Sequence, residues 1–331
     1  MHTLLLALCP LVAPPAADIE VTAAMLKACR VEVPAELFAV TRVVDGDTLW
    51  IERDGEQEKL RLLSVDTEEK LSTGNSSASK PGTAYGERVA GWTQGYFSPR
   101  AGDEDPVRVG LRFPPGGEAR DVYGRLLCHV VTAEGVDFNL LLVRSGMSPY
   151  FNKYGSSRID HGRFVEAQAS AKLEGLGIWE ADQRRAGATR PYAKLVPWWD
   201  ARAEAVDLFR EVAKAKPLLA VEADDPAALQ AALDSGTEWV TVLGLIDRIF
   251  EEDDGSRTLL LRGGDKKRSL RVKIAAESVH ELGVVDLEGA QAEYRQNYLR
   301  FRGGLRWGSR GFDLVNVNPM MIRRAGPEPV R

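Results

Sequence analysis

Four acidic residues lie near the predicted ends of strands, where their carboxylates could bind a cation. Asp45 and Asp47 are two positions apart, so both side chains point to one face of an extended chain, and Gly46 between them permits a bend. Asp66 and the carbonyl of Thr67 follow a second apolar stretch. If the two stretches are neighbours, Asp47, Asp66 and Thr67 could form an all-oxygen site, which is the chemistry that Ca²⁺ prefers.

The remaining acid and two arginines could act on a phosphate group beside that cation. Glu69 lies just beyond Thr67 and could take a proton from a nearby water. Arg61 and Arg125 are permanent planar cations with paired donors, which suit a phosphate that gains charge when it is attacked. Together these residues suit phosphodiester hydrolysis. Each one alone is also compatible with a solvated turn, an outward strand residue or a loop.

These residues require a β-hairpin and several further elements to position them. The stretch DGDTLWIE, the Asp54-Gly55 turn signal and the stretch EKLRLLSVD predict the hairpin. Further strands are predicted at 37–44, 107–113 and 126–132, and helices at 22–30, 85–97, 138–145 and 161–174.

The ordered motifs resemble one known family. The stretches VVDGDT, LRLLSVDTEE, YGE, DVYGR, LVRSGMSPYFNKYG and EAQASAKLEGLGIW are similar in order to the staphylococcal (micrococcal) nuclease family, over roughly residues 36–183. The resemblance implies an α+β fold, namely a five-stranded OB-fold β-barrel with packed helices. It also implies a Ca²⁺-dependent endonuclease that hydrolyses DNA or RNA and leaves 3′-phosphate ends.

The resemblance further implies a role for each matching position. The metal set is Asp47, Asp66 and the carbonyl of Thr67, with Asp45 behind them. The catalytic set is Arg61, Glu69 and Arg125. For substrate binding we expect Tyr123 and Tyr154, with Tyr150 near enough to act as a stacking group.

Three departures from the family pattern carry expectations of their own. Glu68 stands where the family usually has Pro, so we expect the loop that carries Glu69 to be less rigid. Val122 replaces a basic residue that would help to hold a terminal phosphate, and Asn152 occupies a tyrosine position. Substrate binding is therefore expected to be weaker or differently selective.

The rest of the chain predicts further segments. Residues 1–17 resemble a secretory signal without a basic start, so we expect export, periplasmic or secreted, rather than a cytoplasmic location, and no transmembrane segment in the mature chain. Residues 18–35 lead into the nuclease-like domain at 36–183. A helical connector is predicted at 184–236, where Asp225, Pro226 and Gly236 are helix start and stop signals. A β-rich domain, for which the strand pattern favours an OB-like fold, follows at 237–325, with a tail at 326–331.

Charge separates the two predicted domains of this 331-residue chain. Residues 36–182 contain 17 Lys and Arg against 23 Asp and Glu, whereas residues 240–325 contain 15 against 12. Possible nucleic-acid contacts in the basic part are Arg300, Arg302, Arg306 and Trp307. Cations interleaved with aromatic side chains are typical of single-strand binding, although a solvated sheet edge gives the same pattern.

Two other functions remain open at this point. The four histidines have no metal-ligand spacing, which argues against zinc enzymes and His-metal nucleases. A non-catalytic scaffold that binds nucleic acid or protein could use the same barrel, and so could a structural envelope-associated protein with a vestigial site.

Overall fold

The computed structural model describes most of the chain. The described residues are 19–71, 80–99, 102, 105–121, 123–182, 189–262, 270–284, 298–318 and 322–324. The expected signal segment at 1–17, Val122 and the tail at 326–331 lie outside the described residues, so the expectations attached to them stay predictions. The proposed domain boundaries also stay predictions.

In the first half of the described chain, five strands close into a barrel. The strands are β1 (Phe38–Asp45), β2 (Thr48–Arg53), β3 (Glu56–Leu62), β6 (Arg108–Arg112) and β8 (Leu126–Thr132). Their order is β3-β2-β1-β6-β8, and a parallel pairing of β3 with β8 closes the barrel. Asp54 and Gly55 join β2 to β3 with positive φ angles, as a tight hairpin turn requires. The predicted α+β fold with an OB-type barrel is confirmed.

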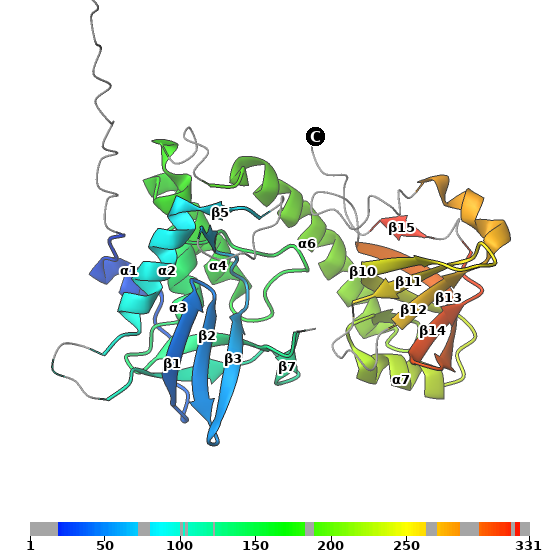
Figure 1. Ribbon diagram of the computed structural model, residues 1–331, viewed down its shortest axis with the longest axis horizontal. Coiled ribbons are helices and arrows are strands. Elements are labelled where there is room, and N and C mark those ends of the chain that lie inside the picture. Colours follow the sequence, from blue (N-terminus) through cyan, green and yellow to red (C-terminus); the bar gives the residue numbers. More distant parts are fainter. Residues whose placement is uncertain are drawn as a thin grey trace, which may run out of the picture.

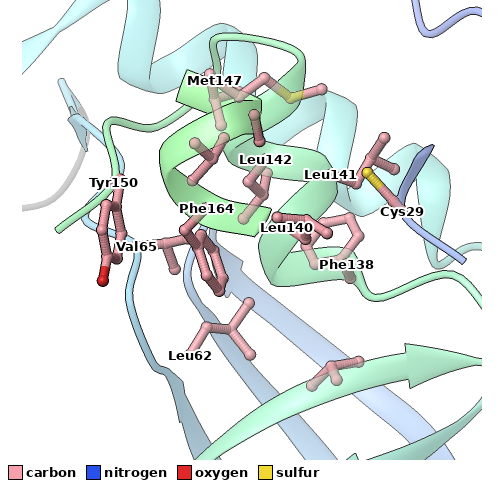
Figure 2. Packing of buried hydrophobic residues seen from close by; sticks show 14 of the residues in the cluster. Cys29, Leu62, Val65, Phe138, Leu140, Leu141, Leu142, Met147, Tyr150 and Phe164 are labelled. Atoms are coloured by element: carbon pink, nitrogen blue, oxygen red, sulfur yellow. The ribbon is translucent and has the colours of Figure 1, made fainter. Parts of the chain in front are cut away.

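Short strands and helices cover this barrel (Figure 1). The short strands are β4 (Glu69–Lys70), β5 (Gly82–Thr83) and β7 (Ala119–Arg120). The helices are α1 (Ala23–Ala28), α2 (Ala84–Tyr96), α3 (Phe138–Arg144), α4 (His161–Glu174) and the 3-10 helix η1 (Gly177–Trp179). The side chains of Leu140, Leu141 and Leu142 are all buried, so α3 is enclosed on several sides and lies within the core (Figure 2).

A connector of mixed structure follows the first barrel. It contains α6 (Tyr192–Ala215), β9 (Ala220–Glu222) and α7 (Pro226–Asp234). The signals for α7 act as the sequence predicts: the side chain of Asp225 accepts a hydrogen bond from the backbone N–H of Ala228 at 2.9 Å, and Gly236 adopts a positive φ after the helix.

The β-rich region beyond the connector is a second closed barrel. Its strands, within the described residues, are β10 (Val240–Glu251), β11 (Arg257–Leu261), β12 (Leu270–Ile274), β13 (Tyr298–Gly308) and β14 (Gly311–Val315). Neighbours along the sheet are β13-β14-β12-β11-β10, and a β13–β10 pairing closes it. The third strand pairs in parallel with the last, as in the first barrel, so both barrels have the same strand order. The 3-10 helix η3 (Ala276–Val284) follows β12, and β15 (Arg323–Arg324) pairs with β13.

Helix α6 lies between the two barrels (Figure 1). Trp199 of its first half belongs to the core of the first barrel, whereas Phe209 of its second half packs with Tyr298 of β13. Arg202, which is fully buried, has its guanidinium 4.9 Å from the ring centre of Tyr298 and 5.6 Å from that of Tyr154. Burial lowers the pKa of Arg202 to about 10. One helix and one arginine thus join the barrels.

None of the helices in the described part of the chain combines the length and the apolar character that a membrane crossing needs.

Asp137 is a buried charge that ties α3 to the barrel. Its side chain caps α3 by accepting the backbone N–H of Leu140 at 3.0 Å, and it lies 2.8 Å from Nδ1 of His129 and 3.2 Å from Nη1 of Arg112. Burial opposes the charged form, but attraction to His129 and the hydrogen bonds outweigh it and hold the pKa of Asp137 below its usual value. This carboxylate therefore contributes stability in its charged form.

We predict that Asp137→Asn lowers the free energy of unfolding by about 3 kcal/mol at pH 7, because it breaks a buried charge pair. Since the folded-state pKa is depressed, the stabilisation is fully present above the unfolded pKa of about 4 and is lost as the pH falls through the folded value. Urea denaturation at pH 7 and pH 3 measures both effects. The exposed Asp54→Asn is the control. A loss below about 0.5 kcal/mol in Asp137→Asn would contradict the prediction.

Candidate active site

The sequence-predicted acids converge at one end of the first barrel. Asp45 ends β1, Asp47 lies in the turn before β2, and Glu69 begins β4. The carbonyl of Asp47 accepts a hydrogen bond from the backbone N–H of Leu62 at 3.0 Å, which holds this turn against the end of β3. Three chain segments therefore meet here because the barrel pairs β1, β2 and β3 side by side.

Asp47 is the buried centre of the site. Its carboxylate forms an ion pair with Arg61 of β3 and accepts hydrogen bonds from the backbone N–H of Thr67 and the hydroxyl of Thr48, both at 3.1 Å. Burial would raise the pKa of Asp47, but Arg61 and Lys80 lower it below the usual value. Asp47 is therefore charged, and it ties Arg61 and Thr67 to the same point.

Asp66 is surrounded by three cations. Its Oδ1 lies 3.1 Å from Nη2 of Arg61 and 2.9 Å from Nζ of Lys80, and its Oδ2 lies 2.8 Å from Nη1 of Arg190. Its backbone N–H donates to Oγ of Ser148 at 2.9 Å. Burial opposes the charge, yet these cations hold the pKa of Asp66 far below the usual range. Asp66 is thus fixed through both carboxylate oxygens and through its backbone.

Lys80 connects the candidate base to the acids. Its ammonium lies 2.6 Å from Oε1 of Glu69 and 2.9 Å from Oδ1 of Asp66. Glu69 itself is half-buried in β4. The structure therefore brings four predicted residues, Asp47, Arg61, Asp66 and Glu69, into one connected network.

The oxygen atoms of this network suit a hard divalent cation. Lys80 already places a positive group between two carboxylates, and the expected ligands Asp47, Asp66 and the Thr67 carbonyl are all oxygen donors. Among the described residues, no group of three or more His, Cys, Asp or Glu side chains is arranged to hold a metal ion. The expected set needs only two carboxylates and a carbonyl, so its chemistry fits Ca²⁺.

Asp45 contacts the backbone of the buried Asp47. Its Oδ1 accepts the backbone N–H of Asp47 at 3.2 Å. Burial, followed by the charge of Asp47, raises the pKa of Asp45 to about 7.

Arg125 is held apart from the carboxylate network. Its Nε donates to Oδ2 of Asp121 at 2.7 Å, and its guanidinium lies 5.4 Å from the ring centre of Tyr123. The neighbouring Leu126 begins β8 and pairs with Leu60 on β3, so Arg125 directly precedes the strand next to the one that carries Arg61. In this structure its ion pair is with Asp121.

The three predicted substrate tyrosines differ sharply in exposure. Tyr123 is 73% exposed, and Tyr154 is 37% exposed with its ring edge against Tyr298 of the second barrel. Tyr150 is 1% exposed: its ring stacks on Phe164, and its hydroxyl lies 2.8 Å from Nδ1 of His161 (Figure 2). The expectation that Tyr150 stacks on a base is therefore corrected, because its ring is a core side chain.

The predicted contacts of the second barrel are not equivalent either. Arg302, Arg306 and Trp307 are exposed. Arg300 is half-buried, with its guanidinium 6.0 Å from the ring centre of Phe209 on α6. Arg300 thus faces the connector rather than open solvent.

Sequence reasoning missed several residues that complete the site. Lys80, Ser148 and Arg190 all contact Asp66. The sequence did mark this region through Glu68, because a glutamate where the family usually has Pro predicted a less rigid loop. In the structure Glu68 is fully buried and accepts a hydrogen bond from Nε of Arg190 at 3.1 Å. The loop is held by a partner that lies 122 residues further along the chain.

Comparisons with known proteins agree with this arrangement. Residues 59–181 match the family model described as Staphylococcal nuclease homologue. The chain is 36% identical over 142 residues to Endonuclease YhcR of Bacillus subtilis (strain 168). This alignment covers 42% of this chain and 11% of that protein. It is 32% identical over 154 residues to Thermonuclease of Staphylococcus intermedius. This alignment covers 45% of this chain and 79% of that protein. Thermonuclease of Staphylococcus hyicus is 28% identical over 144 residues, with 44% of this chain and 76% of that protein covered.

Helix α2 approaches the loop that carries Glu69 through a glycine. A Cβ added at Gly86 would collide with the carbonyl oxygen of Glu69 and would lie 2.8 Å from that of Glu68. A Cβ at Gly91 of the same helix would meet nothing within 4 Å. Gly86 therefore sets the distance between α2 and the active-site loop.

We predict that Gly86→Ala lowers the free energy of unfolding by about 1–3 kcal/mol, because the loop or the helix must move. It should also speed amide hydrogen exchange at residues 68–70. The matched control Gly91→Ala should be neutral or more stable by about 0.5–1 kcal/mol, since alanine favours an exposed helix. Thermal unfolding and hydrogen exchange of both variants check this, and equal behaviour of the two would refute it.

Proposed function

The chain belongs to the staphylococcal nuclease family, and from this premise we propose that it is a Ca²⁺-dependent endonuclease that hydrolyses DNA or RNA and leaves 3′-phosphate ends. The observation that carries the proposal is the network in which Asp47 and Asp66 share the guanidinium of Arg61. The relatives named endonuclease and thermonuclease support nuclease chemistry in general.

The metal would be held by Asp47, Asp66 and the carbonyl of Thr67. When bound, Ca²⁺ would supply positive charge to a phosphodiester group. The two carboxylates are buried and charged, so they would bind a cation without first losing protons.

The other side chains of the site would each have a separate role in the hydrolysis. Arg61 is oriented by two carboxylates, and its planar donors would stabilise the charge that develops on the phosphate. Glu69 would orient a water or take its proton. Arg125 would be a second guanidinium for the phosphate, and the exposed ring of Tyr123 beside it would contact the substrate.

A non-catalytic scaffold is the alternative function. A scaffold would need the same barrel but would not need this network of charged side chains. Burying these charges costs desolvation energy, for which a scaffold has no use. The retained network favours the enzyme.

We predict that plasmid DNA or single-stranded RNA is cleaved in the presence of Ca²⁺ and is untouched in the presence of a chelator. Arg61→Ala and Glu69→Gln should each lower kcat by about 10²–10³-fold, the usual effect of removing an oriented charge contact. Arg53→Ala is the control, because Arg53 pairs with Glu118 away from the network. Binding of nucleic acid without any cleavage would leave the scaffold as the function. Products that a polymerase extends only after phosphatase treatment would identify 3′-phosphate ends.

The second barrel supports a further part of the proposal, namely that it anchors the substrate. Cross-strand pairing aligns Arg248 with Leu260, Leu260 with Arg271, and Asp313 with both Arg271 and Arg306. Residues that face each other across neighbouring strands lie on the same side of a sheet. The side chains of this row therefore lie on one face of the sheet.

A second row extends the same surface. Phe250 pairs with Thr258, and Thr258 pairs with Lys273. The side chains of Lys273 and Arg306 are 47% and 58% exposed, and Phe250 is 44% exposed. The buried Asp313 accepts from Nε of Arg271 at 2.9 Å, so it orients one of these cations. Exposed cations beside an aromatic ring suit a single-stranded nucleic-acid backbone.

We predict that the double variant Lys273→Gln/Arg306→Gln binds single-stranded DNA more weakly in chelator, and that the slope of log affinity against log salt falls by about 1.4. The loss should be similar for different sequences, because phosphate contacts carry no sequence information. The control Lys27→Gln/Arg30→Gln removes the same charge from exposed positions near α1. Equal salt slopes for the two double variants would exclude this surface as the anchor.

A further inference from the structure

Three side chains, Glu68, Arg190 and Tyr192, form a buried group that we call the clamp. Arg190 donates to Oε1 of Glu68 from its backbone N–H at 3.2 Å and from its Nε at 3.1 Å, and the hydroxyl of Tyr192 donates to the same oxygen. Nη2 of Arg190 lies 2.9 Å from the hydroxyl of Tyr192. The clamp therefore joins the active-site loop to the start of α6.

The clamp is enclosed within the protein. Glu68, Arg190 and Tyr192 are 1%, 4% and 3% exposed. A buried carboxylate is tolerated when it is paired and hydrogen-bonded, and removal of one partner leaves a costly unpaired charge. Arg190 is held in one place by these contacts.

The same guanidinium continues to Asp66. Nη1 of Arg190 lies 2.8 Å from Oδ2 of Asp66, and Nη2 donates to its backbone oxygen at 3.1 Å. Arg190 therefore bonds the residues on both sides of Thr67, whose carbonyl is the third expected ligand. Hydrogen-bonded partners behind metal-ligating carboxylates fix the orientation of those ligands, and their loss typically weakens metal affinity by about 10–100-fold.

We propose that Arg190 and Tyr192 are positioning residues for the nuclease site, which hold Asp66 and the Glu68–Glu69 loop in the geometry that the cation requires. This inference rests on the proposed function. Neither side chain reaches solvent, so they act through Asp66 and Glu68 rather than on the substrate. The segment that enters α6 is thus part of the active site, although it lies beyond the last residue of the family match at 181.

The decisive variant is Arg190→Gln/Glu68→Gln. It removes one positive and one negative charge, so the net charge near the cation is unchanged and no unpaired buried charge remains. Loss of the positive charge 2.8 Å from Asp66 would by itself favour a cation there, so a weaker metal affinity reports positioning. Tyr192→Phe removes only one hydroxyl group and should give a smaller change in the same direction. Calorimetric titration with Ca²⁺ measures affinity, and hydrogen exchange at residues 66–69 measures the order of the loop without metal.

The matched control is Arg112→Gln. Arg112 also bridges two carboxylates, those of Asp137 and Asp160, but it lies outside the clamp and the metal network. The double variant should bind Ca²⁺ about 10–100-fold more weakly and exchange faster at residues 66–69. Arg112→Gln should lower the melting temperature with neither effect.

If the folded double variant binds Ca²⁺ with wild-type affinity and exchanges at wild-type rates at residues 66–69, the clamp is only a structural contact and the proposal is overturned. Cleavage of nucleic acid by the wild-type chain would in that case still support the nuclease function. If the wild-type chain neither binds Ca²⁺ nor cleaves nucleic acid, the proposed function falls, and the exchange measurement alone decides whether the clamp holds the loop.

Discussion

The arrangement of the first barrel depends on the compensation of buried negative charge. Asp47 and Asp66 are nearly inaccessible, and a carboxylate in that position is stable only when cations and N–H groups surround it. Arg61 from β3, Lys80 before β5 and Arg190 before α6 supply the positive charge. Segments that are distant in sequence are therefore brought to one end of the barrel.

The second barrel repeats the strand order of the first but does not bring two buried acids together among its described residues. Its charged surface is instead an open sheet face, where Asp313 is the acid within a row of cations. Helix α6 contributes apolar side chains to the core of the first barrel and to a smaller cluster with β10 and β13 of the second barrel. Buried Arg202 lies against rings from each barrel. A guanidinium enclosed by aromatic rings retains favourable cation–π contacts without water.

Local patterns in the sequence predicted the parts of the structure that depend on local chemistry. The Asp54-Gly55 turn, the caps of α7 and the alternation along β2 and β3 follow from backbone preferences, and the site acids follow from where strands end. The spacing could not reveal which face Tyr150 occupies, because its burial depends on packing against Phe164 of a later helix. Arg190 could not be predicted for the same reason: its partners Glu68 and Asp66 are more than a hundred residues away, and the glutamate at position 68 predicted a less rigid loop.

Glu68 also has a consequence for how the site is assembled during synthesis. A proline at this position would stiffen the loop by its own ring as soon as the residue is added. Glu68 instead depends on Arg190, and the 122-residue separation means that the ribosome must add the whole first barrel before the partner exists. Until then the carboxylate stays hydrated and the loop lacks its anchor. The contact between Glu68 and Arg190 can therefore form only after the first barrel has been synthesised.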